Sequence, residues 1–496
     1  MVKKPVYLFQ KLRRHIGIST LTGDFYDLSP EAFHPLKQWN EEFSSFKSYP
    51  SLGAIQELNK KYNIPPEISE LFPLGQEETA MTEEGEGCLT DITLNLTSSC
   101  NLRCAYCWND YGRYSNTGFS EKERSQSTQA NNYGHMPAQI ACKAVDMLVE
   151  LSGEDKDLVV DFYGGEPLMN LDTLLTTVDY CRKNQKSWGV NFNFLLATNG
   201  TLLTPEVAEK LFQRGVQIAV SIDGRKEVHD NNRPFLDGRS SFDCIVKNLK
   251  GIPEEIRKRL VGRTTVTPFY PDMVNLYEDL RTLGFERIEL FESEDACHKI
   301  TPQREKFFFN TDAQYHLLCK EYERLALHYI DETVRGFLDY KKTFFNRFFK
   351  LMQRLYYNHE VTGGCPAAKG QFAVSIEGDI YPCTSFLGVE NFKLGNVMNG
   401  INKEKYNGFI ESIRKRFEHC KECPVFMLCR TTGSCLNINY YFNADPSLPY
   451  ERSCNLFREK LELAVATLAI LAEKIPDRLE ELFGFDAVGR RGNKLY

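Results

Sequence analysis

The stretch Cys100-Asn101-Leu102-Arg103-Cys104-Ala105-Tyr106-Cys107 decides how the rest of the chain is interpreted. Its three cysteines are separated by three and then two residues, so their thiolates can converge on one small object. A [4Fe–4S] cluster usually needs four thiolates. Three local cysteines without a nearby fourth therefore predict a cluster with one iron open to another ligand, as in metal sites that bind substrates. A zinc site or a chance grouping of cysteines is the alternative.

Strand and helix patterns alternate from residue 88 to about residue 300. The stretch above follows an apolar-alternating strand at 89–96, and further strands are predicted at 158–163, 191–197, 217–222, 262–267 and 287–292. Helices are predicted near 137–152, 170–184, 204–214, 241–250 and 273–283. Repeated β–α units indicate a parallel sheet with right-handed crossovers, whose ligands bind at the carboxyl ends of the strands. The long polar segment 110–136 is either disordered or a functional lid.

Polar motifs follow several of these strands. Gly164-Gly165-Glu166-Pro167 ends the second strand; its glycines allow close backbone approach, and Glu166 or nearby carbonyls can accept hydrogen bonds from an ammonium group. Ser221 ends the fourth strand, and Arg233 lies in the following segment 229–234. A guanidinium group suits a carboxylate geometrically. Glu294 and Asp295 follow the sixth strand. They could bind substrate or act as a general base, or they could belong to an ordinary solvated acidic loop.

A second cysteine-rich region begins beyond Gly363. Cysteines recur there in metal-like spacings, including a Gly378-Asp379-Ile380-Tyr381-Pro382-Cys383 element and a Cys420-x2-Cys423-x5-Cys429 run. The complete set is Cys365, Cys383, Cys420, Cys423, Cys429, Cys435 and Cys454. A zinc ribbon would explain Cys420 and Cys423 alone, but not the flanking cysteines. A small domain with little hydrophobic core can be held together by metal clusters.

Together, these motifs resemble the radical S-adenosylmethionine (SAM) enzymes that carry a SPASM domain, over residues 88 to about 460. The resemblance implies an α/β fold: a partial (β/α)6 TIM-like barrel with a C-terminal SPASM iron–sulfur domain. It implies that Cys100, Cys104 and Cys107 hold the SAM-cleaving [4Fe–4S] cluster. It further implies that the turn of Gly164, Gly165, Glu166 and Pro167 holds the SAM amino group, that Arg233 and Ser221 contact its carboxylate, and that Tyr106 lies beside adenine. No catalytic acid or base is assigned.

The same resemblance implies two auxiliary [4Fe–4S] clusters, which makes three clusters in all. Cys420, Cys423, Cys429 and Cys454 would hold the outer one, and Cys365, Cys383 and Cys435 the inner one. Cys429 and Cys435 are separated by five residues where the family usually has three, which leaves the role of Cys435 open. No cysteine lies between Cys365 and Cys383, which predicts an inner cluster with an open iron.

The residues before the barrel form a separate module in the sequence. Short strands at 6–9 and within 17–26, followed by helices near 30–46, 52–62 and 66–71, are similar in order to the winged-helix-like peptide-recognition element of peptide maturases. Such an element binds a leader peptide as an added strand. An unrelated cap is the alternative. We therefore expect domains at 1–85, 86–300, 301–360 (aromatic-rich bridging helices at 311–358) and 361–496.

Composition narrows the function classes. The chain has 496 residues, a net charge of −7 and scattered Lys and Arg, which argues against a nucleic-acid partner. The apolar stretch 461–471 is too short to span a bilayer and predicts a buried helix, and no signal peptide is visible. Ten of the sixteen cysteines fall into metal-like spacings, which indicates a reducing compartment. We expect a cytoplasmic protein without a membrane partner.

Within the family, the motifs at 162–170 and 378–383 look most like peptide maturases that form thioether cross-links. The expected partners are a precursor peptide, with a leader and a Cys-containing core, and an electron donor such as flavodoxin or ferredoxin. Carbon–carbon or carbon–oxygen cross-linking and formylglycine formation on a protein Ser or Cys are alternatives on the same scaffold. A non-catalytic iron–sulfur electron carrier is an alternative of a different class.

Overall fold

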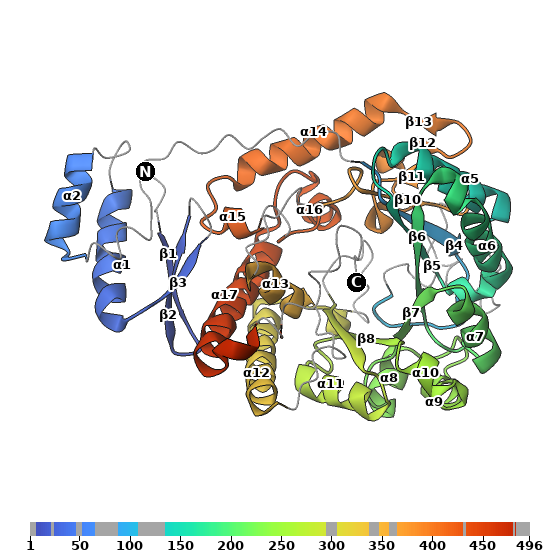
Figure 1. Ribbon diagram of the computed structural model, residues 1–496, viewed down its shortest axis with the longest axis horizontal. Coiled ribbons are helices and arrows are strands. Elements are labelled where there is room, and N and C mark those ends of the chain that lie inside the picture. Colours follow the sequence, from blue (N-terminus) through green and yellow to red (C-terminus); the bar gives the residue numbers. More distant parts are fainter. Residues whose placement is uncertain are drawn as a thin grey trace.

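The computed structural model describes residues 6–20, 24–45, 52–64, 88–107, 134–293, 305–336, 347–356, 365–429, 433–479 and 482. Its centre is one large, mostly parallel sheet with helices packed against it (Figure 1). The predicted α/β class is therefore confirmed. The segment 110–133, the predicted helix at 66–71 and the acidic pair Glu294–Asp295 lie outside the described residues.

All six predicted barrel strands are present and lie side by side in chain order. They are β4 (Asp91–Thr97), β5 (Asp157–Gly164), β6 (Asn191–Thr198), β7 (Val216–Ser221), β8 (Val261–Val266) and β9 (Arg287–Glu292), and each neighbouring pair is parallel. The predicted helices are α5 (Ala138–Leu151), α6 (Leu171–Trp188), α7 (Pro205–Gln213), α9 (Phe242–Gly251) and α11 (Met273–Thr282). Strand and helix bounds agree with the sequence prediction to within a few residues.

The strands form because buried and partly exposed residues alternate along them. In β6, β7 and β8, every second residue is buried, and the residues between them keep some exposure. On β5 and β6, Phe162 and Phe194 stack on the buried side, where Arg182 of α6 covers the Phe194 ring. Helix α6 ends at Gly189, whose φ of 67° is the left-handed conformation that favours glycine at a helix C-terminus.

The sheet continues beyond the predicted barrel. Strand β10 (Gln371–Val374) lies parallel to β4, and β11 (Asp379–Tyr381), β12 (Gly395–Asn396) and β13 (Gly400–Ile401) follow as antiparallel neighbours. The sequence analysis assigned these residues to a separate C-terminal domain and predicted no such pairing. The cysteine-rich region is therefore joined to the first barrel strand by main-chain hydrogen bonds.

Several short elements were not predicted. They are the helices α8 (Lys226–Asn232) and α10 (Glu254–Arg257) and the 3-10 helices η1 (Pro167–Asn170), η2 (Glu305–Phe307), η3 (Thr384–Phe386), η4 (Glu390–Phe392) and η5 (Pro476–Arg478). The cysteine-rich region contains α14 (Lys403–Cys420), α15 (Phe426–Cys429) and α16 (Leu436–Asn443). The predicted bridging helices are α12 (Asp312–Arg335) and α13 (Arg347–Tyr356), with residues 337–346 between them outside the described part.

The N-terminal module has a three-stranded antiparallel sheet, β1 (Val6–Lys11), β2 (Arg14–Ser19) and β3 (Phe25–Leu28), followed by α1 (Pro30–Ser44) and α2 (Leu52–Lys61). One side of its sheet shares a small core with α1 and α2, centred on Trp39 and Phe43. The other side, with Phe9 and Ile16, joins the main core of the molecule. The module is thus packed on the rest of the chain rather than tethered beside it.

The C-terminal helix α17 (Glu451–Lys474) makes that connection (Figure 1). It packs against β1, β2 and β3 on one side and against α12 and α13 on the other. Tyr7 donates a hydrogen bond to Glu462, and Lys11 pairs with Glu459. The predicted buried helix at 461–471 is confirmed, because most of these residues are inaccessible to solvent.

Helix α17 also reaches the barrel. Lys460 Nζ lies 2.7 Å from Glu292 Oε1 at the end of β9, and Tyr322 of α12 donates a hydrogen bond of 2.7 Å to Glu292 Oε2. The Lys460 and Glu292 side chains are 10% and 3% exposed. Breaking such a buried pair by removing one partner costs about 3–5 kcal/mol, so the contact fixes α17 relative to the barrel.

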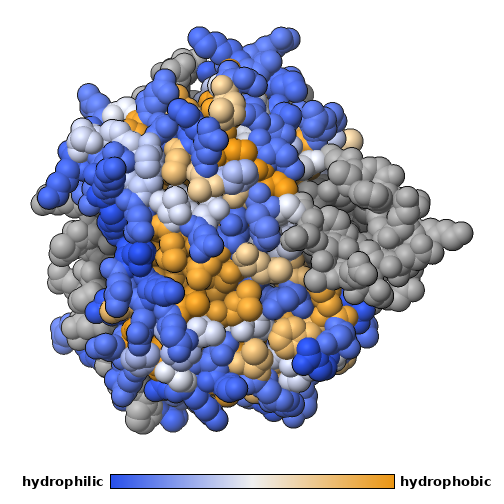
Figure 2. Space-filling view, turned by 90° about the vertical axis from the view of Figure 1, so that its right-hand side faces the viewer, coloured by the Kyte–Doolittle hydropathy of each residue, from blue (hydrophilic) through white to orange (hydrophobic). Residues whose placement is uncertain are grey.

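The surface contains an apolar area. On the side of the molecule that lies to the right in Figure 1, hydrophobic side chains gather in a central patch framed by hydrophilic residues (Figure 2). Patches of this kind mark interaction surfaces in soluble proteins. No helix within the described ranges combines the length and the hydrophobicity needed to cross a lipid bilayer.

Candidate active site

The loop that carries Cys100, Cys104 and Cys107 begins three residues after β4, at the carboxyl end of the sheet. The segment after α8 holds the loop by main-chain hydrogen bonds, 2.9 Å from Arg103 N to Pro234 O and 2.7 Å from Ala105 N to Asn232 O. The loop is therefore held at two places: by its connection to β4, and by hydrogen bonds to the residues that follow β7.

The three thiols lie close enough to influence each other electrostatically. Burial raises the pKa of Cys100, and the neighbouring Cys104 raises it further. Burial also raises the pKa of Cys104 to about 12, opposed by the Arg233 guanidinium and reinforced by Cys107. With pKa values raised in this way, Cys100 and Cys104 stay ionised only beside a cation such as cluster iron. The donor set therefore fits an iron–sulfur cluster that has three protein thiolates and one iron position for another ligand.

The glycine turn after β5 packs directly on this loop. Gly165 N donates to Thr97 O and Glu166 N donates to Ser99 O, both at 2.8 Å. A Cβ atom on Gly165 would lie 2.1 Å from Ser99 O, a distance that no side chain can occupy. The two glycines thus bring the second strand end against the residue that precedes Cys100.

The Glu166 carboxylate is fully buried and committed to the protein. It accepts hydrogen bonds from Thr198 Oγ1 at 2.7 Å, Asn199 N at 2.7 Å and Leu168 N at 3.1 Å. Burial raises its pKa to about 7, although these donors oppose the rise. Glu166 therefore joins the glycine turn to the end of β6. An ammonium group bound at this turn would therefore donate hydrogen bonds to the main-chain carbonyl oxygens of the turn and not to the Glu166 carboxylate.

The turn after β6 also reaches the cysteine loop. Asn199 Nδ2 lies 3.8 Å from Cys100 Sγ and donates to Asn101 Oδ1 at 2.8 Å, and Asn101 Nδ2 donates to Thr201 Oγ1 at 2.8 Å. Amide donors near a thiolate stabilise its negative charge. The sequence alone did not indicate this role for the turn.

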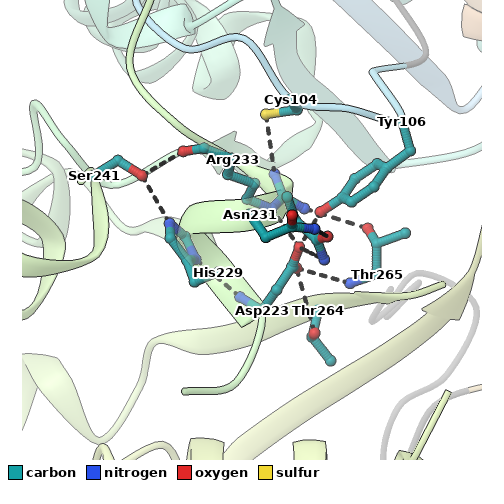
Figure 3. Close-up of polar contacts among 10 residues, drawn as sticks. Cys104, Tyr106, Asp223, His229, Asn231, Arg233, Ser241, Thr264 and Thr265 are labelled. Atoms are coloured by element: carbon teal, nitrogen blue, oxygen red, sulfur yellow. Dashed lines mark hydrogen bonds and ion pairs between the residues drawn. The ribbon is translucent and has the colours of Figure 1, made fainter. Parts of the chain in front are cut away.

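Asp223 organises the opposite side of the site (Figure 3). It follows β7, is fully buried, and pairs with Arg233 Nε at 3.1 Å. Tyr106 donates its hydroxyl hydrogen to Asp223, and Thr265 N donates at 3.0 Å. Burial alone would raise the pKa of Asp223, but Arg233 and the other donors overcome this effect and lower it. Asp223 is therefore an ionised carboxylate inside the protein.

Arg233 connects this carboxylate to the cysteine loop (Figure 3). Its Nη1 lies 3.9 Å from Cys104 Sγ, its Nη2 donates to Thr265 Oγ1 at 3.3 Å, and its guanidinium carbon lies 5.0 Å from the Tyr106 ring centroid. The structure thus brings together three residues that the sequence analysis selected: Cys104, Tyr106 and Arg233. Ser221 lies at the end of β7, paired in register with Arg263.

His229 supports the same network from behind. Asp223 N donates to His229 Nδ1 at 3.1 Å, which places the ring proton on Nε2, and Nε2 lies 2.9 Å from Ser241 Oγ. Ser241 donates in turn to Arg233 O. Burial lowers the pKa of His229 to about 4, so the ring is neutral and acts as a hydrogen-bonded support.

Sequence reasoning missed the roles of Asp223 and Asn199. Asp223 stands in the Ser221-Ile222-Asp223-Gly224 motif after a strand, where a buried acid close to an arginine is a signal for an ion pair. Its partner Arg233 is ten residues further on, beyond the unpredicted helix α8. Without that helix, nothing in the sequence brings the two side chains together.

The seven C-terminal cysteines divide into two groups. Burial raises the pKa of Cys454 to about 12 and that of Cys420 to about 11, and each is raised further by Cys429 and Cys423. Burial also raises the pKa values of Cys365 and Cys383, and Cys435 raises both further. These mutual effects link Cys420, Cys423, Cys429 and Cys454 as one group, and Cys365, Cys383 and Cys435 as the other.

Arg416 of α14 acts electrostatically on cysteines of both groups, and the sequence did not indicate this role. It is 1% exposed, and its Nη2 donates to Ser434 O. Its charge lowers the pKa values of Cys420 and Cys454 in one group and of Cys365 in the other, against the larger effect of burial. A buried cation in this position stabilises thiolates in both groups.

Comparisons with known proteins match parts of the chain that include both cysteine-rich regions. Residues 94–280 match the model of the radical SAM superfamily, and residues 365–424 match that of SPASM, an iron–sulfur cluster-binding domain. The cysteine-type anaerobic sulfatase-maturating enzyme of Clostridium perfringens is 26% identical over 391 residues, which cover 76% of this chain and 97% of that enzyme. The antilisterial bacteriocin subtilosin biosynthesis protein AlbA of Bacillus subtilis is 25% identical, covering 70% of this chain and 68% of AlbA.

Solved structures show the same fold. Native anSMEcpe with bound AdoMet and Cp18Cys peptide has a TM-score of 0.62 at 20% identity and covers 78% of this chain and 100% of its own. SuiB of Streptococcus suis bound to the precursor peptide SuiA has a TM-score of 0.50 at 15% identity and covers 92% of this chain and 99% of its own.

Proposed function

The chain belongs to the radical SAM enzymes that carry a SPASM domain, and on this premise we propose that it modifies a ribosomally made peptide by forming a thioether cross-link. The radical SAM domain binds SAM and a [4Fe–4S] cluster, and the SPASM domain binds auxiliary iron–sulfur clusters. Bound to its cluster, SAM supplies a 5′-deoxyadenosyl radical that removes a hydrogen atom from the substrate.

The contacts around Cys100, Cys104 and Cys107 support the proposed SAM site. We assign these cysteines to the SAM-cleaving cluster and the turn of Gly164 to Pro167 to the SAM amino group. Arg233 would bind the SAM carboxylate with its remaining guanidinium hydrogens, with Ser221 as a second polar contact. Tyr106, held in place by Asp223, would pack beside the adenine. Asp223 is an addition to the predicted set, as the residue that orients Arg233 and Tyr106.

The N-terminal module supports a peptide substrate. The structural match to SuiB covers 92% of this chain, so about 40 of the 496 residues lie outside it. The N-terminal module is longer than that, at residues 1–85, and the match therefore includes part of the module. Strand β3 is an edge of the module's sheet and can receive a leader peptide as an added strand. Because the module packs on α17, a bound leader would lie on the helix that also carries Cys454 and Lys460.

The observation that carries the thioether proposal is the group of Cys365, Cys383 and Cys435. It has three thiols, so one iron of a cluster there would be open to a substrate thiolate. Joining a cysteine sulfur to carbon breaks one C–H bond and one S–H bond. One hydrogen atom leaves on 5′-deoxyadenosine, one proton goes to solvent, and one electron returns to an auxiliary cluster. An external donor such as flavodoxin or ferredoxin, in a reducing cytoplasm, would supply the initial electron.

Mass spectrometry of a partner peptide tests the proposal. A short Cys-containing peptide encoded next to this protein would be co-expressed with it, or incubated anaerobically with the reduced protein and SAM. We expect a loss of two hydrogens and a cysteine that no longer reacts with iodoacetamide. An unchanged mass, under conditions where 5′-deoxyadenosine forms, would contradict the proposal.

Formylglycine formation on a protein Cys or Ser is the second candidate. It is favoured by the similarity to the sulfatase-maturating enzyme of Clostridium perfringens, which extends over 97% of that enzyme. The two products differ chemically, because formylglycine carries an aldehyde and a thioether does not. A product that reacts with a hydrazide reagent would therefore select this second function.

A further inference from the structure

The inner face of the sheet, meaning the face opposite α5, α6, α7 and α11, carries charged and polar residues. On β6, β7 and β8, every inner-face residue keeps partial exposure, whereas every residue facing the helices is buried. A packed barrel core would bury both sides. Along β6, β7 and β8 the inner face is therefore a surface that solvent or a bound molecule can reach, and Asp161 of β5 also keeps partial exposure, whereas the inner-face residues of β4 are buried.

Asp161 lies on this inner face, in the middle of β5. Its neighbours along the strand, Val160 and Phe162, are fully buried on the helix side, and its register partners are Thr93 on β4 and Leu195 on β6. Within the described residues, its carboxylate makes no hydrogen bond and no ion pair. The side chain keeps partial exposure, but the surrounding sheet shields much of the carboxylate from water, and this desolvation raises the pKa of Asp161 to about 7.

The charges around Asp161 do not neutralise it. Arg263 on β8 lowers its pKa and Asp91 on β4 raises it. Arg263 itself forms an ion pair with Glu289: its Nε and Nη2 donate hydrogen bonds of 3.0 and 2.9 Å to Glu289 Oε2. The Arg263 guanidinium also stacks on the Phe291 ring. The Arg263–Glu289 pair has no net charge. Asp161 therefore leaves the inner face with a negative charge that lacks a protein partner in the described part of the chain.

A second polar group on the neighbouring strand also lacks a partner. Asn95 of β4 is 0% exposed, and neither its side-chain oxygen nor its side-chain nitrogen has a hydrogen-bond partner. Asn95 is on the same face as Thr93, one step closer to the glycine turn, and pairs in register with Tyr163. Unpaired buried amides are rare because each costs about 1–3 kcal/mol. Two adjacent strands thus present unsatisfied polar groups to the same face.

We propose that the inner face at β5 binds a basic side chain of the substrate peptide, with the Asp161 carboxylate accepting a charge-assisted hydrogen bond from its ammonium or guanidinium group. The inference rests on the proposed function, because it names the class of side chain that the peptide inserts below the SAM site. An acidic side chain would be repelled by Asp161.

Equilibrium dialysis of the cluster-loaded protein with SAM tests this without turnover. The probes are acetyl-Gly-Lys-Gly-amide and its neutral isostere, acetyl-Gly-norleucine-Gly-amide. We expect the lysine probe to bind at least about tenfold more tightly, the size of one charge-assisted hydrogen bond. The variant Asp161→Asn should lose this preference, and Asp161→Glu should keep part of it. The control variant Asp157→Asn changes a carboxyl on the same strand, which already has a donor in Asn191, and should retain it.

The pH dependence gives a second readout in the unaltered protein. Protonation of Asp161 competes with the cation, so binding of the lysine probe should weaken as the pH falls below about 7, while norleucine binding stays constant. Equal binding of both probes, no measurable binding of the lysine probe, or a preference that survives in Asp161→Asn would overturn the inference. The proposed function is judged separately from the mass of the product peptide, so either can fail alone.

Discussion

The replacement Asp223→Asn is predicted to damage both stability and SAM binding. The Asp223–Arg233 pair has an Oδ2–Nε distance of 3.1 Å, and its side chains are 0% and 10% exposed. Removing one member of such a pair leaves a buried charge without its partner, at about 3–5 kcal/mol. For a domain of this size, that lowers the thermal midpoint by about 6–20 °C. Because Arg233 and Tyr106 lose their common anchor, SAM affinity should also fall by about tenfold or more.

The assay compares thermal unfolding and SAM binding of anaerobic, cluster-loaded variants. The matched control is Asp279→Asn, because Asp279 pairs with Arg225 at 3.0 Å but at the surface, with side chains 21% and 47% exposed. It should cost no more than about 1 kcal/mol and leave SAM binding unchanged. The double variant Asp223→Asn/Arg233→Met removes both charges, so it should recover stability but not SAM affinity.

Two results would refute the proposed role of the Asp223–Arg233 pair. If Asp223→Asn melts within about 2 °C of the unaltered protein and binds SAM equally well, the buried pair neither stabilises the barrel nor orients Arg233. If the double variant binds SAM normally, Arg233 is not a SAM contact.

Three other predictions use different parts of the structure. Gly165→Ala should yield protein deficient in the SAM-cleaving cluster by iron analysis and EPR, because its Cβ would meet Ser99 O, whereas Gly408→Ala, in open space on α14, should load normally. Cys435→Ala should lose one auxiliary cluster and keep the other two clusters in the Mössbauer spectrum; loss of both auxiliary clusters, or of neither, would contradict the two-group division. Between about pH 4 and 7, Asp161 keeps a proton in the native state that it has released in the unfolded state, so its contribution to the free energy of unfolding falls as the pH rises. When the free energy of unfolding in urea is plotted against pH, Asp161→Asn should flatten the curve between about pH 4 and 7. An unchanged slope would contradict the raised pKa.

The sequence predicted the local elements well and the long-range pairings poorly. Strands β4 to β9 were found because apolar residues alternate along them, and glycine-containing turns follow β5, β6 and β7. The pairing of β10 with β4 joins residues 371–374 to residues 91–94, and nothing in either short stretch specifies the other. The docking of the N-terminal sheet on α17 likewise depends on contacts such as Tyr7 with Glu462, which link opposite ends of the chain.

In the candidate site, too, local features were predicted from the sequence and long-range contacts were not. Cysteine spacing identified the thiols because metal ligation imposes local geometry. Asp223 remained without a role because its function depends on Arg233, Tyr106 and Thr265, which come from three separate segments. Arg416 was missed because a lysine or arginine on a helix is usually exposed, whereas tertiary packing leaves this side chain only 1% exposed.

The central claim is that Cys100, Cys104 and Cys107 hold a cluster with an iron that binds SAM. The most direct measurement is 5′-deoxyadenosine formation by the reconstituted protein after anaerobic reduction with dithionite in the presence of SAM. We predict that the unaltered protein forms 5′-deoxyadenosine and that the variant with all three cysteines changed to Ala forms none while its auxiliary clusters remain. A reconstituted protein that leaves SAM intact, or a triple variant that still cleaves it, would contradict the claim.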